Sequence, residues 1–261
     1  MNMRIAATTV LTALLLAACA GGEGKPKSDP PMTLTYRSND AVGAAGQFEN
    51  YRQVVQATAP SYVRVIIKAK EGGADKDASS NIVNGASGVI VDPSGLVITA
   101  GHIALDTKLD AQIITMDGKY HKAVIMRVDR NRELALLRMD PFPGIQAAPL
   151  ADSSKLTVGE PVFAIGTPGN KPGVVSLGQV VEARHAERLD YNGFGFDDAV
   201  KLRIEVDPGN SGGPVYDRKG QLIGIIAAFV LGNTDASKNY ALSYLAYAVP
   251  SNAIRAYIGK R

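Results

Sequence analysis

The sequence predicts an all-β protein folded as barrels or as a sandwich. About a dozen short apolar runs are separated by turn residues. The 261 residues include 27 glycines and 14 prolines but no tryptophan, and no repeat of fixed period runs through them. Hydrophobic residues make up 46% of the chain. This composition is typical of a globular domain with a sizeable core.

Two short helices are expected at the ends of the folded part, with strands between them. Apolar residues at helical spacing indicate the first helix within 48–57, which Pro60 ends. The second begins after Pro250 and contains Ile254 and Ile258. Strands are expected at 62–67, 88–91, 96–99, 111–116, 123–128, 134–139, 161–165, 179–183, 199–206, 222–230 and 244–249.

The first eighteen residues are predicted to be a lipoprotein signal peptide. Arg4 precedes an apolar run that is too short to span a bilayer comfortably. The run ends in Leu16-Ala17-Ala18-Cys19, which resembles a bacterial lipobox and implies lipidation of Cys19. The alternative is a plain secretory peptide that contains an incidental cysteine.

Residues 19–46 are expected to form the lipidated cysteine and a flexible tether. The stretch from Ala20 to about Thr33 is rich in Gly, Lys, Ser, Asp and Pro, which favours an unstructured linker. Two or more acyl chains on Cys19 would give stable anchoring. Because Cys19 is the single cysteine, the mature domain is predicted to have no internal disulfide.

The charge pattern argues against a nucleic-acid partner. The formal net charge is +3, and removal of residues 1–18, which carry only Arg4, lowers it by one. No dense Lys/Arg run is present. A net charge this small does not indicate binding to nucleic acid.

A serine and a histidine suggest nucleophilic catalysis. Ser211 lies in the turn Gly209-Asn210-Ser211-Gly212-Gly213-Pro214, and His102 follows a predicted strand directly. A histidine beside a serine acts as its general base. Glycines let the backbone bend sharply, so the amides of Gly209 and Ser211 can converge to form an oxyanion hole.

Several segments in order resemble the trypsin-like serine proteases of the HtrA/Deg type. The similarity covers about residues 50–258. The matching segments are 55–63, 85–102, 133–137, 164–169, 209–214 and 247–251. The resemblance implies a chymotrypsin/trypsin-like double six-stranded β-barrel in 47–261, with lobes at about 47–150 and 151–261 and the site in the cleft between them. It also implies a protease module alone, without the PDZ domains that such relatives usually carry.

The resemblance further implies that Glu133 is the third catalytic residue. This position is normally aspartate, and glutamate keeps the charge while adding one methylene. A displacement of about 1 Å in an active site can cost on the order of a hundredfold in rate. Asp129, four residues earlier, is the second candidate. Three interpretations stay open: a working Ser-His-Glu triad, a slow protease, and a protease fold retained for binding.

Four residues are candidates for substrate binding. Glu205 lies six residues before Ser211, where related enzymes can hold the base of the primary pocket, and there it would favour Lys or Arg. The alternative is that Glu205 faces solvent within an alternating strand. Segment 226–230, with Ala227, Ala228 and Phe229, would line the cleft and pair with the substrate backbone.

No metal or cofactor is implied by the sequence. His121 and His185 lie in polar surroundings without paired spacing, so both are interpreted as surface histidines rather than zinc ligands. The sequence therefore predicts a serine endopeptidase, lipid-anchored at the bacterial cell envelope and facing the periplasm or exterior, that cleaves envelope proteins through an acyl-enzyme. The alternative is a catalytically weak or silent protease fold that binds or scaffolds there.

Overall fold

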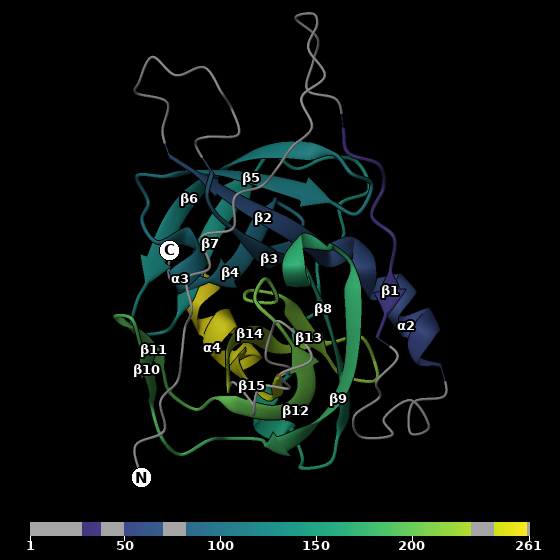
Figure 1. Ribbon diagram of the computed structural model, residues 1–261, viewed down its shortest axis with the longest axis vertical. Coiled ribbons are helices and arrows are strands. Elements are labelled where there is room, and N and C mark those ends of the chain that lie inside the picture. The colour runs from purple at the N-terminus through teal and green to yellow at the C-terminus, as the bar shows by residue number, and fades with distance from the viewer. Residues whose placement is uncertain (1–27, 38–49, 70–81, 231–242, 260–261) are drawn as a thin grey trace, which may run out of the picture.

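The computed structural model describes residues 28–37, 50–69, 82–230 and 243–259, which form two β-barrels stacked one above the other (Figure 1). The predicted signal peptide and Cys19 lie outside the described residues. The short helices are α2 (Tyr51–Thr58), α3 (Gly101–Ala104) and α4 (Ser251–Ile258).

The first barrel closes in the order β2-β3-β4-β7-β6-β5, with every pair antiparallel. Alternate residues of each strand point inward, and Val63, Val65, Ile113 and Leu137 are fully buried there. The strands are β2 (Tyr62–Lys68), β3 (Ile82–Asp92), β4 (Leu96–Ala100), β5 (Asp110–Thr115), β6 (Tyr120–Asp129) and β7 (Leu134–Met139).

The second barrel follows the order β9-β12-β15-β14-β13-β8 and is closed by pairing of β8 with β9. Its interior holds Val180, Leu202, Ile204 and Ile223, all fully buried. The strands are β8 (Pro161–Gly166), β9 (Val174–Glu182), β12 (Val200–Val206), β13 (Pro214–Tyr216), β14 (Leu222–Val230) and β15 (Ser243–Pro250). The prediction of a double six-stranded barrel is confirmed.

One hairpin was not predicted. Strands β10 (Leu189–Tyr191) and β11 (Phe194–Phe196) pair antiparallel. Asn192 and Gly193 join them with φ of 50° and 77°. An Asn-Gly pair with both φ values positive is the signature of a two-residue type I′ turn. The hairpin leaves the second barrel and reaches the site described below.

Part of the predicted tether packs against the domain. Strand β1 (Thr35–Tyr36) pairs in parallel with β9 at Val174 and Val175. Met32, Leu34 and Tyr36 are partly buried against the core. These three residues alternate with polar ones, as strand residues do, but the run is too short to stand out from its Gly- and Pro-rich neighbours. The flexible-tether prediction is therefore wrong for this part of the chain, and the folded unit begins before residue 47.

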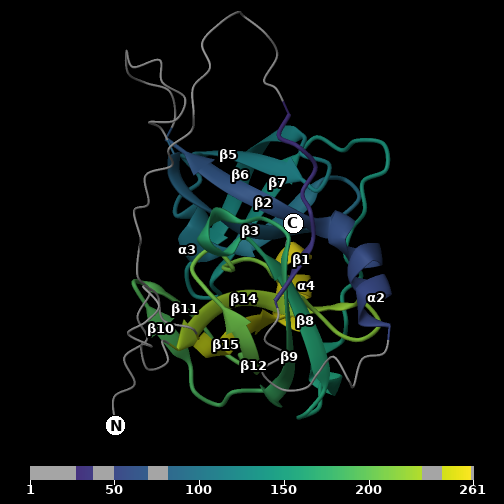
Figure 2. The ribbon, with the colours of Figure 1, turned by 45° about the vertical axis from the view of Figure 1, so that its right-hand side comes forward.

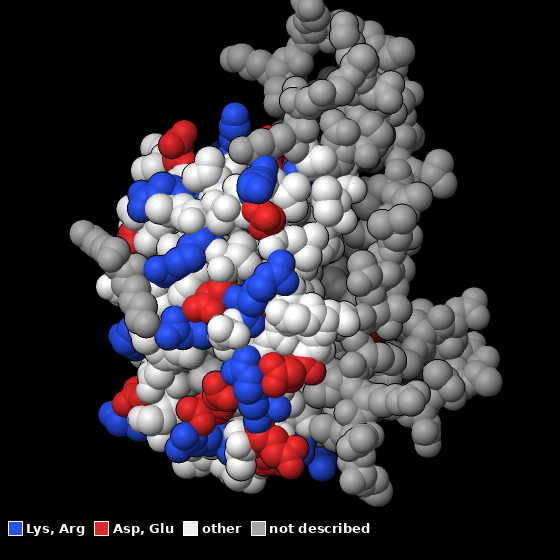
Figure 3. Space-filling view, turned by 90° about the vertical axis from the view of Figure 1, so that its left-hand side faces the viewer, with Lys and Arg blue, Asp and Glu red and all other residues white. Residues whose placement is uncertain are grey.

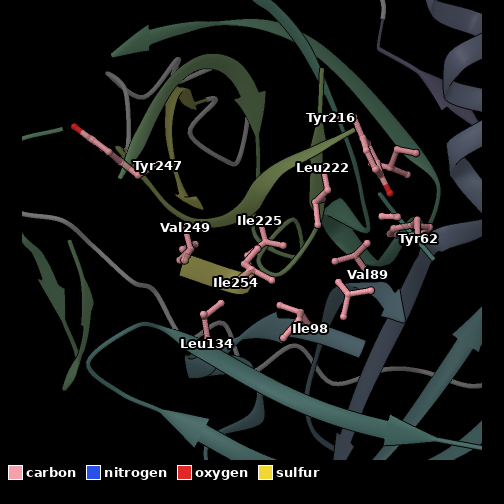
Figure 4. Packing of buried hydrophobic residues seen from close by; sticks show 14 of the residues in the cluster. Tyr62, Val89, Ile98, Leu134, Tyr216, Leu222, Ile225, Tyr247, Val249 and Ile254 are labelled. Atoms are coloured by element: carbon pink, nitrogen blue, oxygen red, sulfur yellow. The ribbon is translucent and has the colours of Figure 1, made fainter. Parts of the chain in front are cut away.

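A single apolar cluster joins the two barrels. Val89, Ile98 and Leu134 come from the first barrel, and Ile225 and Val249 come from the second. Figure 4 shows Ile98, Leu134, Ile225 and Val249 around Ile254 of α4, with Val89 on the Tyr62 side of the same cluster. Each of these side chains is fully buried or 1% exposed, so the lobes share a core rather than touching at their surfaces.

The surface carries mixed charge. On the face shown in Figure 3, basic and acidic side chains are interspersed with uncharged ones. Among the residues that the structure describes, no helix has the length and apolar character to cross a bilayer.

Candidate active site

His102 sits at the end of a strand of the first barrel. β4 ends at Ala100, and the short helix α3 follows directly and packs against β7. The amide of Gly101 donates to the carbonyl of Glu133 (3.1 Å). On the other side, the Asn84 amide contacts the carbonyl of His102 at 3.4 Å. The backbone around the imidazole is therefore fixed from both sides.

Glu133 is aimed at the histidine ring. Its side chain is completely buried, and Oε1 pairs with Nδ1 of His102. The same oxygen accepts from the His102 amide at 3.4 Å. The backbone of Glu133 is left-handed, with φ of 55°, a conformation that is uncommon outside glycine and often marks functional positions. A carboxylate in this place fixes the imidazole tautomer with its proton on Nδ1 and leaves Nε2 free to accept a proton.

Asp129, the second candidate for this role, is engaged elsewhere. Its carboxylate accepts from the amides of Asn131 (3.0 Å) and Arg132 (3.1 Å) and pairs with the Arg132 guanidinium at 3.0 Å. These bonds close the turn that leads into Glu133. Asp129 thus shapes the turn, while Glu133 reaches the ring.

The unpredicted β10–β11 hairpin covers the histidine. The Tyr191 and Phe194 rings meet the His102 ring edge-on, with centroids 5.8 Å and 6.5 Å away. Burial, reinforced by the negative charge of Glu133, raises the pKa of Tyr191 above its ordinary value, so its hydroxyl stays protonated. That hydroxyl donates to the carbonyl of Ala227 at 3.0 Å. The hairpin therefore packs beside the His102 ring, and the Glu133 side chain behind that ring is fully buried.

The Ser211 turn is closed by its own hydrogen bonds. The Asn210 amide donates to the carbonyl of Asp207 (3.0 Å), and Gly213 donates to the carbonyl of Asn210 (2.8 Å). Gly209 has φ of 103°, and a Cβ atom there would lie 2.2 Å from the Thr167 carbonyl oxygen. Only glycine fits this position without distortion.

The turn is docked against the strands that carry His102. The Ser87 amide of β3 donates to the Ser211 carbonyl (3.0 Å), and the Ser87 hydroxyl donates to the Gly209 carbonyl (2.8 Å). A Cβ on Gly212 would approach the Ser87 carbonyl oxygen to 2.2 Å and the Ala100 amide nitrogen to 3.0 Å. Gly212 follows the serine directly, and Ala100 precedes Gly101 and His102, so the structure brings the two segments together.

The reacting groups remain available. Ser211 is half-buried, and among the described residues it makes no hydrogen bond to His102. Catalytic hydrogen bonds are often long in the absence of substrate. Within the same part of the chain, the amides of Gly209 and Ser211 have no protein acceptor. Two free amides beside a serine can receive the oxyanion of an acyl-transfer intermediate.

The four predicted substrate-binding residues fall into two groups. Ala227, Ala228 and Phe229 lie on β14, whose Ile226 exchanges backbone hydrogen bonds with Gly212 (2.7 Å) and Gly213 (2.9 Å). This strand is therefore adjacent to the serine turn. Glu205 is 7% exposed and does not face solvent as one interpretation expected.

Glu205 is paired with an arginine from the N-terminal segment. Its Oε1 contacts the guanidinium of Arg37. Arg37 lies within the range predicted to be the tether, and no local sequence pattern marks it as a partner of Glu205. Its partner is buried at the end of β12, where a lone carboxylate would be costly.

The other two histidines have structural surroundings. His121 stacks on Phe142 with ring centroids 4.6 Å apart, and burial lowers its pKa. His185 has a side chain that is only 12% exposed and pairs with Glu182 at 2.6 Å, so it is less exposed than predicted. Over the described ranges, no group of three or more His, Cys, Asp or Glu side chains is arranged to hold a metal ion.

Part of the chain matches a known protein family, and several curated proteins are similar to it. Residues 86–225 match the trypsin-like peptidase domain family. The chain is 29% identical to serine protease HTR4 of Bos taurus, over 84% of this chain and 43% of the relative. It is 32% identical to serine protease Do-like HtrA of Lactococcus lactis, over 72% of this chain and 48% of the relative.

A bacterial relative carries a location in its name. The probable periplasmic serine endoprotease DegP-like of Chlamydia pneumoniae is 30% identical, over 61% of this chain and 31% of that protein. The matched part of the chain spans half or less of the length of these curated relatives.

Proposed function

Because the chain belongs to the trypsin-like peptidase family, we propose that it is a serine endopeptidase that uses Ser211, His102 and Glu133. The observation that carries the proposal is the buried Glu133 carboxylate on Nδ1 of His102, beside a serine turn docked on the same barrel. The alternative role of Glu133, a surface charge at the start of a strand, would leave its side chain exposed, whereas the side chain is fully buried against the His102 ring.

The chemistry follows from these positions. Nε2 of His102 takes the proton as the Ser211 hydroxyl attacks the scissile carbonyl. The amides of Gly209 and Ser211 bind the resulting oxyanion. Collapse of the intermediate transfers the proton to the leaving amine and forms an acyl-enzyme, and attack by water, with His102 again as base, releases the acid and regenerates Ser211.

The buried anion supplies electrostatic stabilisation. His102 becomes positively charged in each transition state, and the Glu133 carboxylate faces that charge in a site of low dielectric constant. The rings of Tyr191 and Phe194 pack edge-on against the His102 ring, and the Glu133 side chain is fully buried. The Glu133 carboxylate therefore stabilises the imidazolium form of His102 in the transition states.

The proposed location is outside the cytoplasm, with a lipid anchor on Cys19 and envelope proteins as substrates. Its support is the lipobox-like Leu16-Ala17-Ala18-Cys19 and the periplasmic relative. Bacteria expressing the full chain should incorporate labelled palmitate into it, and Cys19→Ala should remove the label. Label retained in Cys19→Ala would contradict anchoring at this residue.

A fluorophosphonate probe tests the proposed nucleophile. The probe labels only an activated serine with a functioning base and oxyanion hole. We expect stoichiometric labelling of the folded protein, with the adduct on the peptide that contains Ser211. Protein unfolded in denaturant serves as the control and should remain unlabelled.

An unlabelled but correctly folded protein would contradict the proposal. In that case the remaining interpretation is a silent protease fold that binds polypeptides. An adduct on another serine would equally reject Ser211 as the nucleophile.

A further inference from the structure

We propose that Arg37 is a positioning residue that holds the Ser211 turn in its reactive arrangement. This proposal rests on the proposed protease function and concerns how the serine turn of the same site is held in place. It starts from residues 32–37, named here the N-terminal strap, which Figure 2 shows as the purple segment running along the side of both barrels.

The N-terminal strap is bound to each barrel by its backbone. The Met32 amide donates to the carbonyl of Met116 (2.8 Å) in the first barrel. The amides of Thr35 and Arg37 donate to Gly173 (2.9 Å) and Val175 (3.0 Å) in the second. The last of these bonds fixes Arg37 beside the end of β12.

The Arg37 guanidinium bridges two carboxylates of one strand end. One nitrogen contacts Oε1 of Glu205, and the other contacts Oδ2 of Asp207 at 2.6 Å. Glu205 belongs to β12, and Asp207 follows directly after the strand ends at Val206, so both carboxylates lie within reach of one guanidinium. A planar guanidinium with several donors suits this geometry better than an ammonium group.

This cluster differs from the other Lys/Arg–carboxylate pairs of the described residues. The side chains of Arg37, Glu205 and Asp207 are 13%, 9% and 14% exposed, whereas the carboxylate in each other pair is at least 24% exposed. Oε2 of Glu205 and Oδ1 of Asp207 are buried without a hydrogen-bond partner in this part of the chain. Both carboxylates therefore depend on Arg37.

Asp207 connects the cluster to the nucleophile. Its amide donates to the Asn210 side-chain oxygen (3.1 Å), and its carbonyl accepts from the Asn210 amide (3.0 Å). Asn210 is 1% exposed and directly precedes Ser211. A shift of Asp207 therefore moves the peptide that carries the Ser211 oxyanion amide.

Removal of Arg37 leaves two adjacent buried acids without a countercharge. Like charges in a site of low dielectric constant repel, and each is poorly solvated. Asp207 relieves this by turning toward water and carries the 207–210 turn with it. The predicted effect is on the reaction step rather than on substrate affinity, because the strap itself lies outside the β14 strand proposed to bind substrate.

The test compares Arg37→Met in the full chain with the matched control Arg184→Met, whose partner Asp198 is exposed. We expect Arg37→Met to lower kcat on the order of a hundredfold, as a misplacement of about 1 Å does, with KM changed less than about threefold. Arg184→Met should retain wild-type kcat. Equal kcat for wild type and Arg37→Met would overturn the proposal.

Two further measurements separate positioning from loss of folding. Hydrogen exchange should accelerate at the Asn210 and Gly213 amides in Arg37→Met while the first-barrel strands stay protected. The triple variant Arg37→Met/Glu205→Gln/Asp207→Asn removes the buried charge. Its kcat should be at least about tenfold higher than that of Arg37→Met. Exchange unchanged in the turn, or no recovery in this variant, would contradict the electrostatic role.

The exchange measurement needs no catalysis, so the two proposals fail separately. A wild-type chain unreactive toward the fluorophosphonate rejects the protease function whatever the exchange shows. A reactive wild type with an equally reactive Arg37→Met rejects only the role of Arg37.

Discussion

Replacing Ser211 with alanine is expected to lower kcat for peptide hydrolysis by about 10⁶-fold, as removal of the nucleophilic serine does in a serine protease. Alanine removes the atom that forms the acyl-enzyme but keeps the turn, because the described contacts of Ser211 use its backbone carbonyl. Cleavage of an unfolded protein substrate, followed by the appearance of new amino termini, measures the effect.

The remaining activity identifies what the rest of the site contributes. His102→Ala should cost about as much as Ser211→Ala, and the double variant should be no slower, since the two residues act as one unit. A double variant slower than either single one by another factor of 10⁶ would show that the residues act independently. That result would contradict the triad.

Replacing Glu133 with glutamine is expected to lower kcat by about 10⁴-fold, the loss seen when the triad acid of a related enzyme becomes an amide. The glutamine amide fits the same space, but it can donate to Nδ1 and stabilise the wrong tautomer. It also removes the charge that faces the imidazolium. Steady-state kinetics with thermal unfolding as a check on folding measures this prediction.

Glu133→Asp is the informative comparison for the length of the side chain. Aspartate keeps the charge but retracts it by one methylene from the contact with Nδ1. We expect a loss on the order of a hundredfold from the misplacement. A faster Glu133→Asp enzyme would show that the longer side chain hinders the reaction rather than supporting it.

The sequence predicted the strands well where their apolar pattern was long. β7 and β14 match their expected limits, because continuous apolar runs bounded by turns have few alternatives. The β10–β11 hairpin was missed although Asn192-Gly193 is a strong turn signal. Its strands are three residues each, which is too short for an alternating apolar and polar pattern to be recognised in the sequence.

The site was predictable in part. His102, Glu133 and Ser211 each follow a recognisable local pattern, so their segments could be identified before any coordinates. The contacts of Arg37 could not be, because Glu205 lies 168 residues away in the chain. This ion pair forms only because the N-terminal strap packs along the second barrel. No periodicity in the local sequence predicts where the strap packs.

The apolar cluster around Ile254 has a consequence for evolution and for engineering of this protein. Leu134 of one barrel and Val249 of the other both belong to the cluster that contains Ile254 of α4. Each barrel therefore buries part of its apolar surface only in the presence of the other barrel and of α4. A gene fragment encoding one barrel would yield a chain that exposes this apolar surface to water. Recombination that exchanges one barrel must therefore supply a matching α4.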